Sequence, residues 1–169
     1  LPLACDVKRF APIYPNPAKK VPLIVHAPTN RLFKGTAYVE KAINDLQKNF
    51  SFTFQIVEKK TNKEAIQIYA QADIIVDQLL FGSYGAFSVE AMALGKVVVA
   101  FIRDDVRSKL PADCPIVNAN PDTIYDVLSD LIQHPEKRRE IGMASRKFAE
   151  SYHSVEVVIG KLLEIYKQL

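Results

Sequence analysis

The feature that most constrains the fold is a pair of strand-like runs, 72–77 and 96–101, joined through a glycine-bearing loop and a helix-like segment at 85–94. The second run is too uniformly apolar for a sheet with one face in water, which indicates a strand buried on both faces. Buried strands that alternate with helices predict a parallel sheet covered on both sides.

The same alternation extends over the chain from residue 21 onward. Strands are also predicted at 21–26, 51–57 and, more weakly, 115–117, and helices at 39–50, 62–70, 121–133, 135–151 and 155–169. Asn62 is the expected cap of its helix. The predicted fold is α/β, a Rossmann-like doubly wound parallel sheet with helices on both faces and a C-terminal helical tail.

Domain organisation follows from proline placement and length. Four prolines lie within residues 1–20, which indicates an extended lead-in segment rather than a packed element. Residues 21–169 are expected to form a single domain. Because the first residue is Leu1 rather than Met, we expect the chain to be a fragment or a trimmed protein.

The predicted tail helix, 155–169, carries an apolar stripe. This stripe suits packing on the same domain, on a missing part of the protein, or on a second copy. Its members are Val155, Ile159, Leu162, Tyr166 and Leu169.

Composition excludes several classes of protein. The chain is 49% apolar and 24% charged, which argues against disorder, and it has neither a bilayer-length apolar run nor a signal segment. The two cysteines and three histidines are too scattered for a metal site. The sequence lacks a Walker-type GxxxxGK[ST] loop, a GxGxxG after the first strand, and a GxSxG elbow. We therefore expect no metal and no cofactor.

The positive charge is concentrated in the first part of the chain. Residues 1–60 hold ten Lys/Arg against four Asp/Glu, although the net charge of the chain is only +3. Such a surface suits phosphates, nucleic acid or an acidic membrane, and it is equally typical of a solvated face at Lys59 and Lys60. No aromatic residues are interleaved with these cations as a base-stacking surface needs, so nucleic acid is set aside.

Candidate ligand residues follow the first predicted strand. Ligands of open parallel sheets bind beyond the carboxyl ends of the strands. There, the guanidinium of Arg31 can grip a phosphate and the ammonium of Lys34 can add a point charge. The alternative is a pair of surface cations in a loop.

A second candidate loop follows the strand at 72–77. Backbone N–H groups at Gly85, Ala86 and Phe87, at the start of a helix, can bind phosphate or sugar oxygens. Glu90 lies in an otherwise apolar helix, where a carboxylate needs partners. Ribose hydroxyls can supply them, and a structural ion pair is the alternative.

Three further side chains stay open between roles. His26 ends the first strand, where it either lines the ligand site or makes structural hydrogen bonds. Asp77 either orders its loop or contacts the ligand. His153, in the helical tail, is expected at the surface.

Taken in order, the motifs resemble a known family. Arg31-x-x-Lys34-Gly35, the run 72–76 and the run 85–98 look like the carboxy-terminal half of a family-four (group 1) glycosyltransferase with the two-domain GT-B fold. Residues 1–10 also resemble the interdomain segment that leads into this half.

The resemblance implies a donor site for a UDP-, GDP- or ADP-sugar in a retaining, metal-independent hexosyltransferase. Arg31 and Lys34 match the cations that stabilise the leaving diphosphate, and Glu90 matches the glutamate expected on the ribose. The turn 85–87 matches the loop whose amides meet sugar and phosphate. Val57 and Glu58 fall at the expected base-binding edge.

One departure from the family pattern stands out. The first glutamate of the family's pair would fall at Gly82, and glycine has no side chain to bind a sugar. The alternatives are compensation by Asp77, a different donor, or a non-catalytic scaffold module that has lost donor binding. A nucleotide-sugar epimerase or a glycan phosphorylase is a further alternative.

The acceptor-binding N-terminal half of the family is missing from this sequence. The resemblance therefore implies that the chain alone binds donor weakly and transfers no sugar. It also implies a full-length cytoplasmic enzyme of cell-surface polysaccharide biosynthesis, acting on a glycan or lipid-linked acceptor, with peripheral contact at the inner face of the membrane.

Overall fold

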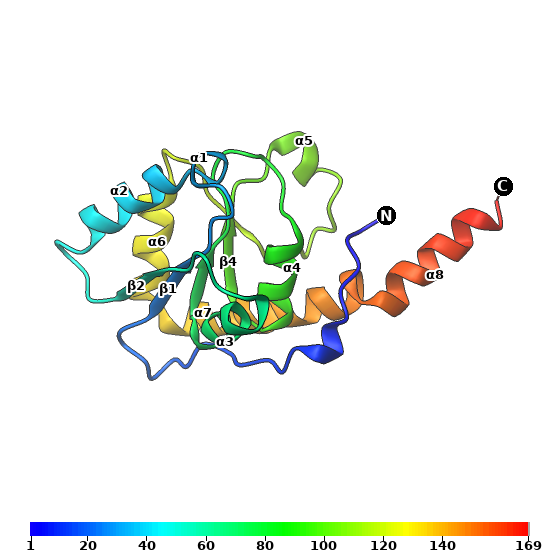
Figure 1. The fold of residues 1–169 in the computed structure, drawn as a ribbon, viewed down its shortest axis with the longest axis horizontal. Coiled ribbons are helices and arrows are strands. Elements are labelled where there is room, and N and C mark those ends of the chain that lie inside the picture. The colour runs from blue at the N-terminus through cyan, green and yellow to red at the C-terminus, as the bar shows by residue number, and fades with distance from the viewer. Residues whose placement is uncertain (169) are drawn as a thin grey trace.

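A five-stranded parallel sheet forms the centre of the computed structural model, which describes residues 1–168 (Figure 1). The strands lie side by side in the order β2-β1-β3-β4-β5. Their bounds are β1 (Leu23–His26), β2 (Thr53–Ile56), β3 (Ile74–Val76), β4 (Val97–Ala100) and β5 (Val117–Asn118). All pairs are parallel, so the predicted sheet is confirmed.

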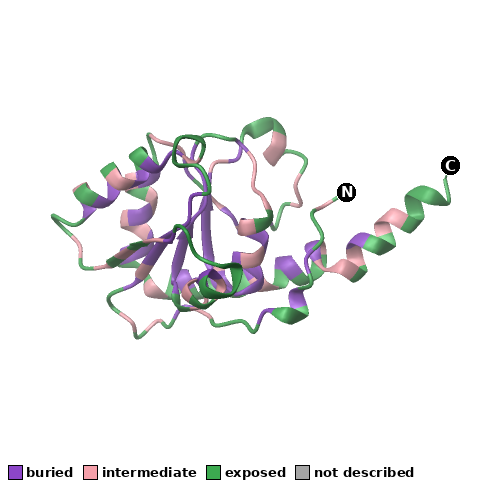
Figure 2. Ribbon diagram, viewed as in Figure 1, coloured by how far each residue is buried: buried purple, intermediate pink, exposed green. Residues whose placement is uncertain are grey.

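Helices cover both faces of this sheet. One face packs against α2 (Thr36–Leu46) and α6 (Ile124–Gln133). The other packs against α3 (Asn62–Gln71), α4 (Ala86–Ala93) and α7 (Pro135–Phe148). Successive side chains of a strand point to opposite faces, so Ile74 enters one core and Ile75 the other. Figure 2 shows the buried central strands between these layers, which confirms the doubly wound prediction.

The strand order places a topological switch point between β1 and β3. From β1 the chain passes to β2 on one side, whereas from β3 it passes to β4 on the other side. His26 and Val76 are in register at the ends of these two strands. The loops after β1 and β3 therefore start at the same level and diverge, which is where open α/β sheets bind their ligands.

The segment 1–20 packs against the domain, so the prediction of an unpacked lead-in is wrong. It includes the 3₁₀ helix η1 (Val7–Arg9), and the Phe10 side chain is buried. Nη1 of Arg146 donates hydrogen bonds to the carbonyl oxygens of Val7 and Phe10. One arginine on α7 thus satisfies the irregular backbone of the segment, a partner that its proline-rich sequence does not reveal.

One helix boundary differs from the prediction in an informative way. Thr61, not Asn62, caps α3, because its hydroxyl accepts from the N–H of Glu64 while the Glu64 carboxylate accepts from the N–H of Thr61. A short helix, α5 (Asp104–Arg107), follows β4.

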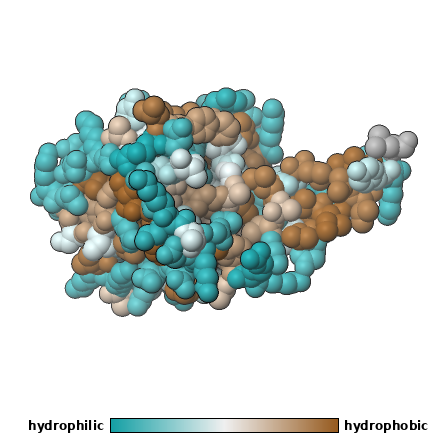
Figure 3. All heavy atoms as spheres, in the orientation of Figure 1, coloured by the Kyte–Doolittle hydropathy of each residue, from teal (hydrophilic) through white to brown (hydrophobic). Residues whose placement is uncertain are grey.

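The C-terminal helix extends away from the body of the domain (Figure 1). A π-helix, η2 (Ala149–His153), leads into α8 (Val155–Tyr166), so the predicted tail helix is present but ends at Tyr166, and Leu169 lies outside the described residues. Ile159 and Tyr166 of the predicted stripe are exposed, and Figure 3 shows the apolar colour along this helix. What covers the stripe stays a prediction.

Candidate functional site

The loop after β1 folds into a short helix, α1 (Arg31–Lys34), that fixes the two predicted cations. The Asn30 side chain accepts a hydrogen bond from the N–H of Phe33 and so begins the helix. Gly35 ends it with φ +72°, and a Cβ at this position would lie 3.2 Å from Cγ of Leu80. The glycine thus permits both the turn and the close approach of the loop after β3.

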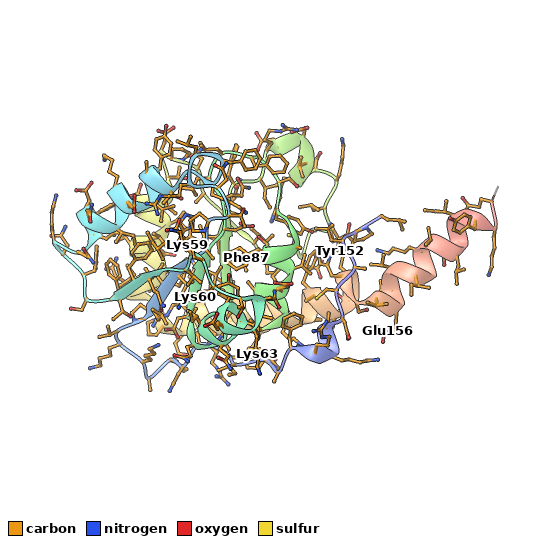
Figure 4. The ribbon with its side chains drawn as sticks, in the orientation of Figure 1. Lys59, Lys60, Lys63, Phe87, Tyr152 and Glu156 are labelled. Carbon is orange, nitrogen blue, oxygen red and sulfur yellow. The ribbon has the colours of Figure 1, made fainter. Side chains whose placement is uncertain are left out.

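A cavity of about 600 Å³ lies beyond the ends of β1 and β2. It brings together three predicted site residues, Arg31, Val57 and Glu58. The remaining lining residues are Ala27, Pro28, Thr29, Lys59, Lys60, Ala65 and Tyr69. Figure 4 labels Lys59 and Lys60 on this face of the domain, near Phe87.

The charge pattern alone did not favour a site role at Lys59 and Lys60 over a solvated face. Both line the cavity, and Lys59 has φ +54°, a left-handed conformation that is uncommon for a residue with a side chain. Within residues 1–168 no carboxylate oxygen lies within 4.0 Å of either ammonium. The sequence feature that could have indicated a site role for both lysines is their position directly after the carboxyl end of a strand.

Arg31 is paired with two carboxylates, of which only Glu58 lines the cavity. Nη2 donates to Oε1 of Glu40 at 2.5 Å, and Nη1 donates to Oε2 of Glu58 at 3.1 Å. Hydrogen bonds to Glu40 and then to Glu58 raise the pKa of the Arg31 guanidinium above its ordinary value. These bonds use two of the five N–H groups of the guanidinium, so a phosphate that takes the Nη1 bond to Glu58 competes with that carboxylate.

Lys34 and Asp77 join the two loops beneath the surface. Lys34 donates to Oδ1 of Asp77, and Oδ2 accepts from the hydroxyl of Ser88 at 2.6 Å. The Asp77 side chain has no exposed surface. Of the two roles left open for Asp77, these contacts support loop ordering, and a contact with the donor stays a prediction.

His26 is also a buried structural residue. Nδ1 donates to the carbonyl oxygen of Val76 at 2.8 Å, and Nε2 accepts from the hydroxyl of Thr36 at 2.9 Å. Burial lowers the pKa of His26, so the neutral ring that this pattern requires is favoured. The prediction that His26 lines the ligand site is therefore corrected, because the side chain reaches no surface.

Glu90 lies in a different hollow from Arg31. This hollow, about 160 Å³, also contains Ala86 from the predicted turn together with Asp6 and Arg9 from the lead-in. Burial raises the pKa of Glu90, and the more distant charge of Arg9 lowers it. Within residues 1–168 no lysine or arginine nitrogen lies within 4.0 Å of its carboxylate, so no ion pair explains the residue.

Tyr69 forms the wall between the large cavity and α4. It lines the cavity, and its ring centroid lies 4.8 Å from that of Phe87. Burial raises the pKa of Tyr69, and the charges of Glu90 and Asp77 raise it further. The first turn of α4, preceded by Gly85, has no side-chain cap, so its N–H groups are open to an acceptor.

The backbone explains why position 82 holds glycine. Gly82 has φ +82°, and an added Cβ would overlap Cγ of Arg103 and lie 2.8 Å from its Cδ. The methylene groups of the Arg103 side chain thus occupy the space that the Cβ of a glutamate at position 82 would need.

His153 corrects another prediction. It is almost fully buried rather than at the surface, with Nδ1 donating to the carbonyl oxygen of Leu3 and Nε2 accepting from the hydroxyl of Tyr84. The fold therefore ties the lead-in to the loop before α4 through the tail. Across residues 1–168 no group of three His, Cys, Asp or Glu side chains is arranged to hold a metal ion.

No protein-family model and no curated protein matches the sequence. Solved structures do match. Sucrose-phosphate synthase from Thermosynechococcus elongatus superposes with a TM-score of 0.75 at 14% identity, over 99% of this chain and 51% of that one. The C-terminal domain of a group 1 glycosyltransferase from Francisella tularensis matches at TM-score 0.60 and 16% identity, over 90% of this chain and all of that domain. The chain has the fold of the C-terminal domain of group 1 glycosyltransferases.

A further match is the Anabaena protein HepE in complex with UDP-glucose, at TM-score 0.67 and 14% identity over 98% of this chain and 56% of HepE. This chain spans about half the length of HepE and of the synthase. The predicted Rossmann-like half of the GT-B fold is confirmed by these structures.

None of the helices in residues 1–168 combines the length and the apolar composition that a bilayer crossing requires.

Proposed function

We propose that this chain is the nucleotide-sugar donor-binding half of a retaining, metal-independent glycosyltransferase. The observation that carries the proposal is the large cavity at the carboxyl ends of β1 and β2, beside the switch point, with Arg31, Lys59 and Lys60 in its lining. Such a position is the usual ligand site of an open parallel sheet. Three cations against one carboxylate, Glu58, suit an anionic ligand.

Each part of the donor has a candidate partner. Arg31 and Lys34 stabilise the diphosphate as negative charge develops on the leaving group. Val57 and Glu58, which line the cavity, contact the base, and the amides at residues 85–87 meet sugar and phosphate oxygens. Glu90, half-buried and without a cation, accepts hydrogen bonds from the ribose hydroxyls.

The transferred sugar is of the hexose type, and the acceptor is a glycan or a lipid-linked glycan. The base is that of UDP, GDP or ADP, and HepE, a structural match, was crystallised with UDP-glucose. No cofactor takes part. The acceptor half belongs to another part of the protein, so the chain by itself binds donor without transferring sugar. The full-length enzyme acts in the cytoplasm, in peripheral contact with the membrane, in cell-surface polysaccharide synthesis.

A calorimetric titration with UDP, GDP and ADP and their hexose conjugates tests this function. We expect saturable binding of one nucleotide in the micromolar to millimolar range, and weaker binding at high salt because the contacts are ionic. The absence of saturable binding for the whole panel, with a folded domain, contradicts the proposal.

A non-catalytic scaffold module is the second candidate, favoured by one observation. Both expected phosphate cations are already paired, Arg31 with Glu40 and Glu58, and Lys34 with Asp77. In a domain that has lost donor binding, these ion pairs never need to break. Nucleotide binding that depends on Arg31 excludes this candidate.

A further inference from the structure

Glu58 and Arg31 are partners that line the same cavity. Nη1 of Arg31 lies 3.1 Å from Oε2 of Glu58, and both side chains are partly exposed, at 45% and 37%. Glu40 binds the other nitrogen, Nη2, at 2.5 Å but is not among the cavity-lining residues. The two carboxylates therefore bind different nitrogens of one guanidinium, and of the two only Glu58 lines the cavity together with Arg31.

We propose that Glu58 is a displaceable counter-ion that occupies Arg31 in the empty cavity and competes with the ligand's phosphate. This inference rests on the proposed function and gives Glu58 a regulatory role in place of a simple donor contact. A phosphate oxygen replaces Oε2 of Glu58 at Nη1, while Glu40 keeps the guanidinium in position through Nη2. Affinity for the diphosphate is thereby set below what the cations alone would give.

The release of Glu58 is favoured by its neighbours. Lys59 and Lys60 follow it directly in the chain, line the same cavity, and have no carboxylate partner in residues 1–168. After displacement the Glu58 carboxylate can therefore remain near positive charge. Exposed ion pairs contribute little free energy, so exchanging Glu58 for a phosphate at Arg31 costs little.

The test uses inorganic pyrophosphate, which has no base or ribose, and uridine, which has no phosphate. We expect Glu58→Gln to raise the association constant for pyrophosphate about two- to fivefold at low salt, the range of an exposed ion pair. The gain should shrink at high salt, and uridine affinity should not rise. A matched control is Asp45→Asn, which removes the same charge from α2 at a residue paired with Lys41 and Lys48 instead.

The double variant Arg31→Ala/Glu58→Gln separates competition at Arg31 from a general change in potential. We expect no gain over Arg31→Ala alone. An equal gain in that background, a similar gain in Asp45→Asn, or unchanged or weaker pyrophosphate binding by Glu58→Gln would each overturn the inference. Wild-type binding of UDP without any gain in Glu58→Gln overturns only the counter-ion role. Failure of both proteins to bind UDP and pyrophosphate overturns the proposed function as well.

Discussion

The ammonium of Lys34 and the carboxylate of Asp77 form an ion pair across the switch point between β1 and β3. The Asp77 side chain is fully buried, and its second oxygen accepts from Ser88 of α4. One aspartate thus links α1, the end of β3 and the start of α4. The relative position of the two ligand loops depends on this link.

Removing the Asp77 charge should destabilise the domain. Asp77→Asn leaves the mostly buried Lys34 ammonium without its partner, and breaking a buried pair costs about 3 kcal/mol or more. Ser88→Ala removes only one hydrogen bond to the same carboxylate and should cost about 1 kcal/mol. Urea unfolding measures both. Equal costs for the two variants would show that the pair does not hold the loops together.

Placing a glutamate at position 82 should be unfavourable. Gly82→Glu imposes a side chain on a residue with φ +82° and forces the Arg103 stem to move, so we expect a loss of about 1–3 kcal/mol. Gly85→Ala is the control, because no atom lies within 4 Å of a Cβ there and φ is −121°. A thermal melt compares them. A Gly82→Glu variant as stable as the wild type would refute the steric account.

Lys96 should make stability rise at alkaline pH. Its buried ammonium donates to the carbonyl oxygens of Ile13 and Ala70, and burial lowers its pKa to about 8. Between pH 8 and about 10.4 the unfolded chain binds the proton and the folded chain does not, so raising the pH favours folding.

The difference in unfolding free energy between wild type and Lys96→Met should therefore shift by about 3 kcal/mol in favour of the wild type over this window. Exposed Lys63→Met controls for the loss of one charge. Urea unfolding at several pH values supplies the data. A difference that stays constant from pH 8 to 10.5 would contradict the buried, charged lysine.

Glu90 should have the opposite effect near acidic pH. Burial raises its pKa, so the folded state keeps the carboxyl proton to higher pH than the unfolded state. Stability is then lost as pH rises from the ordinary glutamate pKa, about 4.3, through the raised value. We expect Glu90→Gln to be more stable than the wild type at pH 7 and equally stable below pH 4. A wild type that is more stable at pH 7 would indicate an unrecognised partner for the carboxylate.

Much of the fold was predictable, because it depends on patterns that are local in sequence. The uniform apolar runs at β3 and β4 require burial on both faces, and burial on both faces requires covering helices. Contacts made by single long side chains were not predictable. The guanidinium of Arg146 binds the lead-in backbone, and nothing in the spacing of that segment indicates this partner.

The site was predicted at the level of loops but less well at the level of side chains. The loops after β1 and β3 do meet, through Lys34 and Asp77. Position beyond a strand does not reveal depth, however, and His26 and Asp77 proved to lie beneath the surface, where hydrogen bonds satisfy them. Whether Glu90 and the amides at 85–87 bind donor stays a prediction.

The most direct test of the account compares UDP with uridine in the wild type and in Arg31→Ala, which leaves the Lys34–Asp77 pair intact, with binding followed by amide NMR shifts. If the Arg31 guanidinium holds the diphosphate, the variant should bind UDP about tenfold more weakly, the loss expected for a charge-assisted contact, and uridine with nearly unchanged affinity. Equal losses for the two ligands, or unchanged UDP binding, would contradict the donor-site assignment.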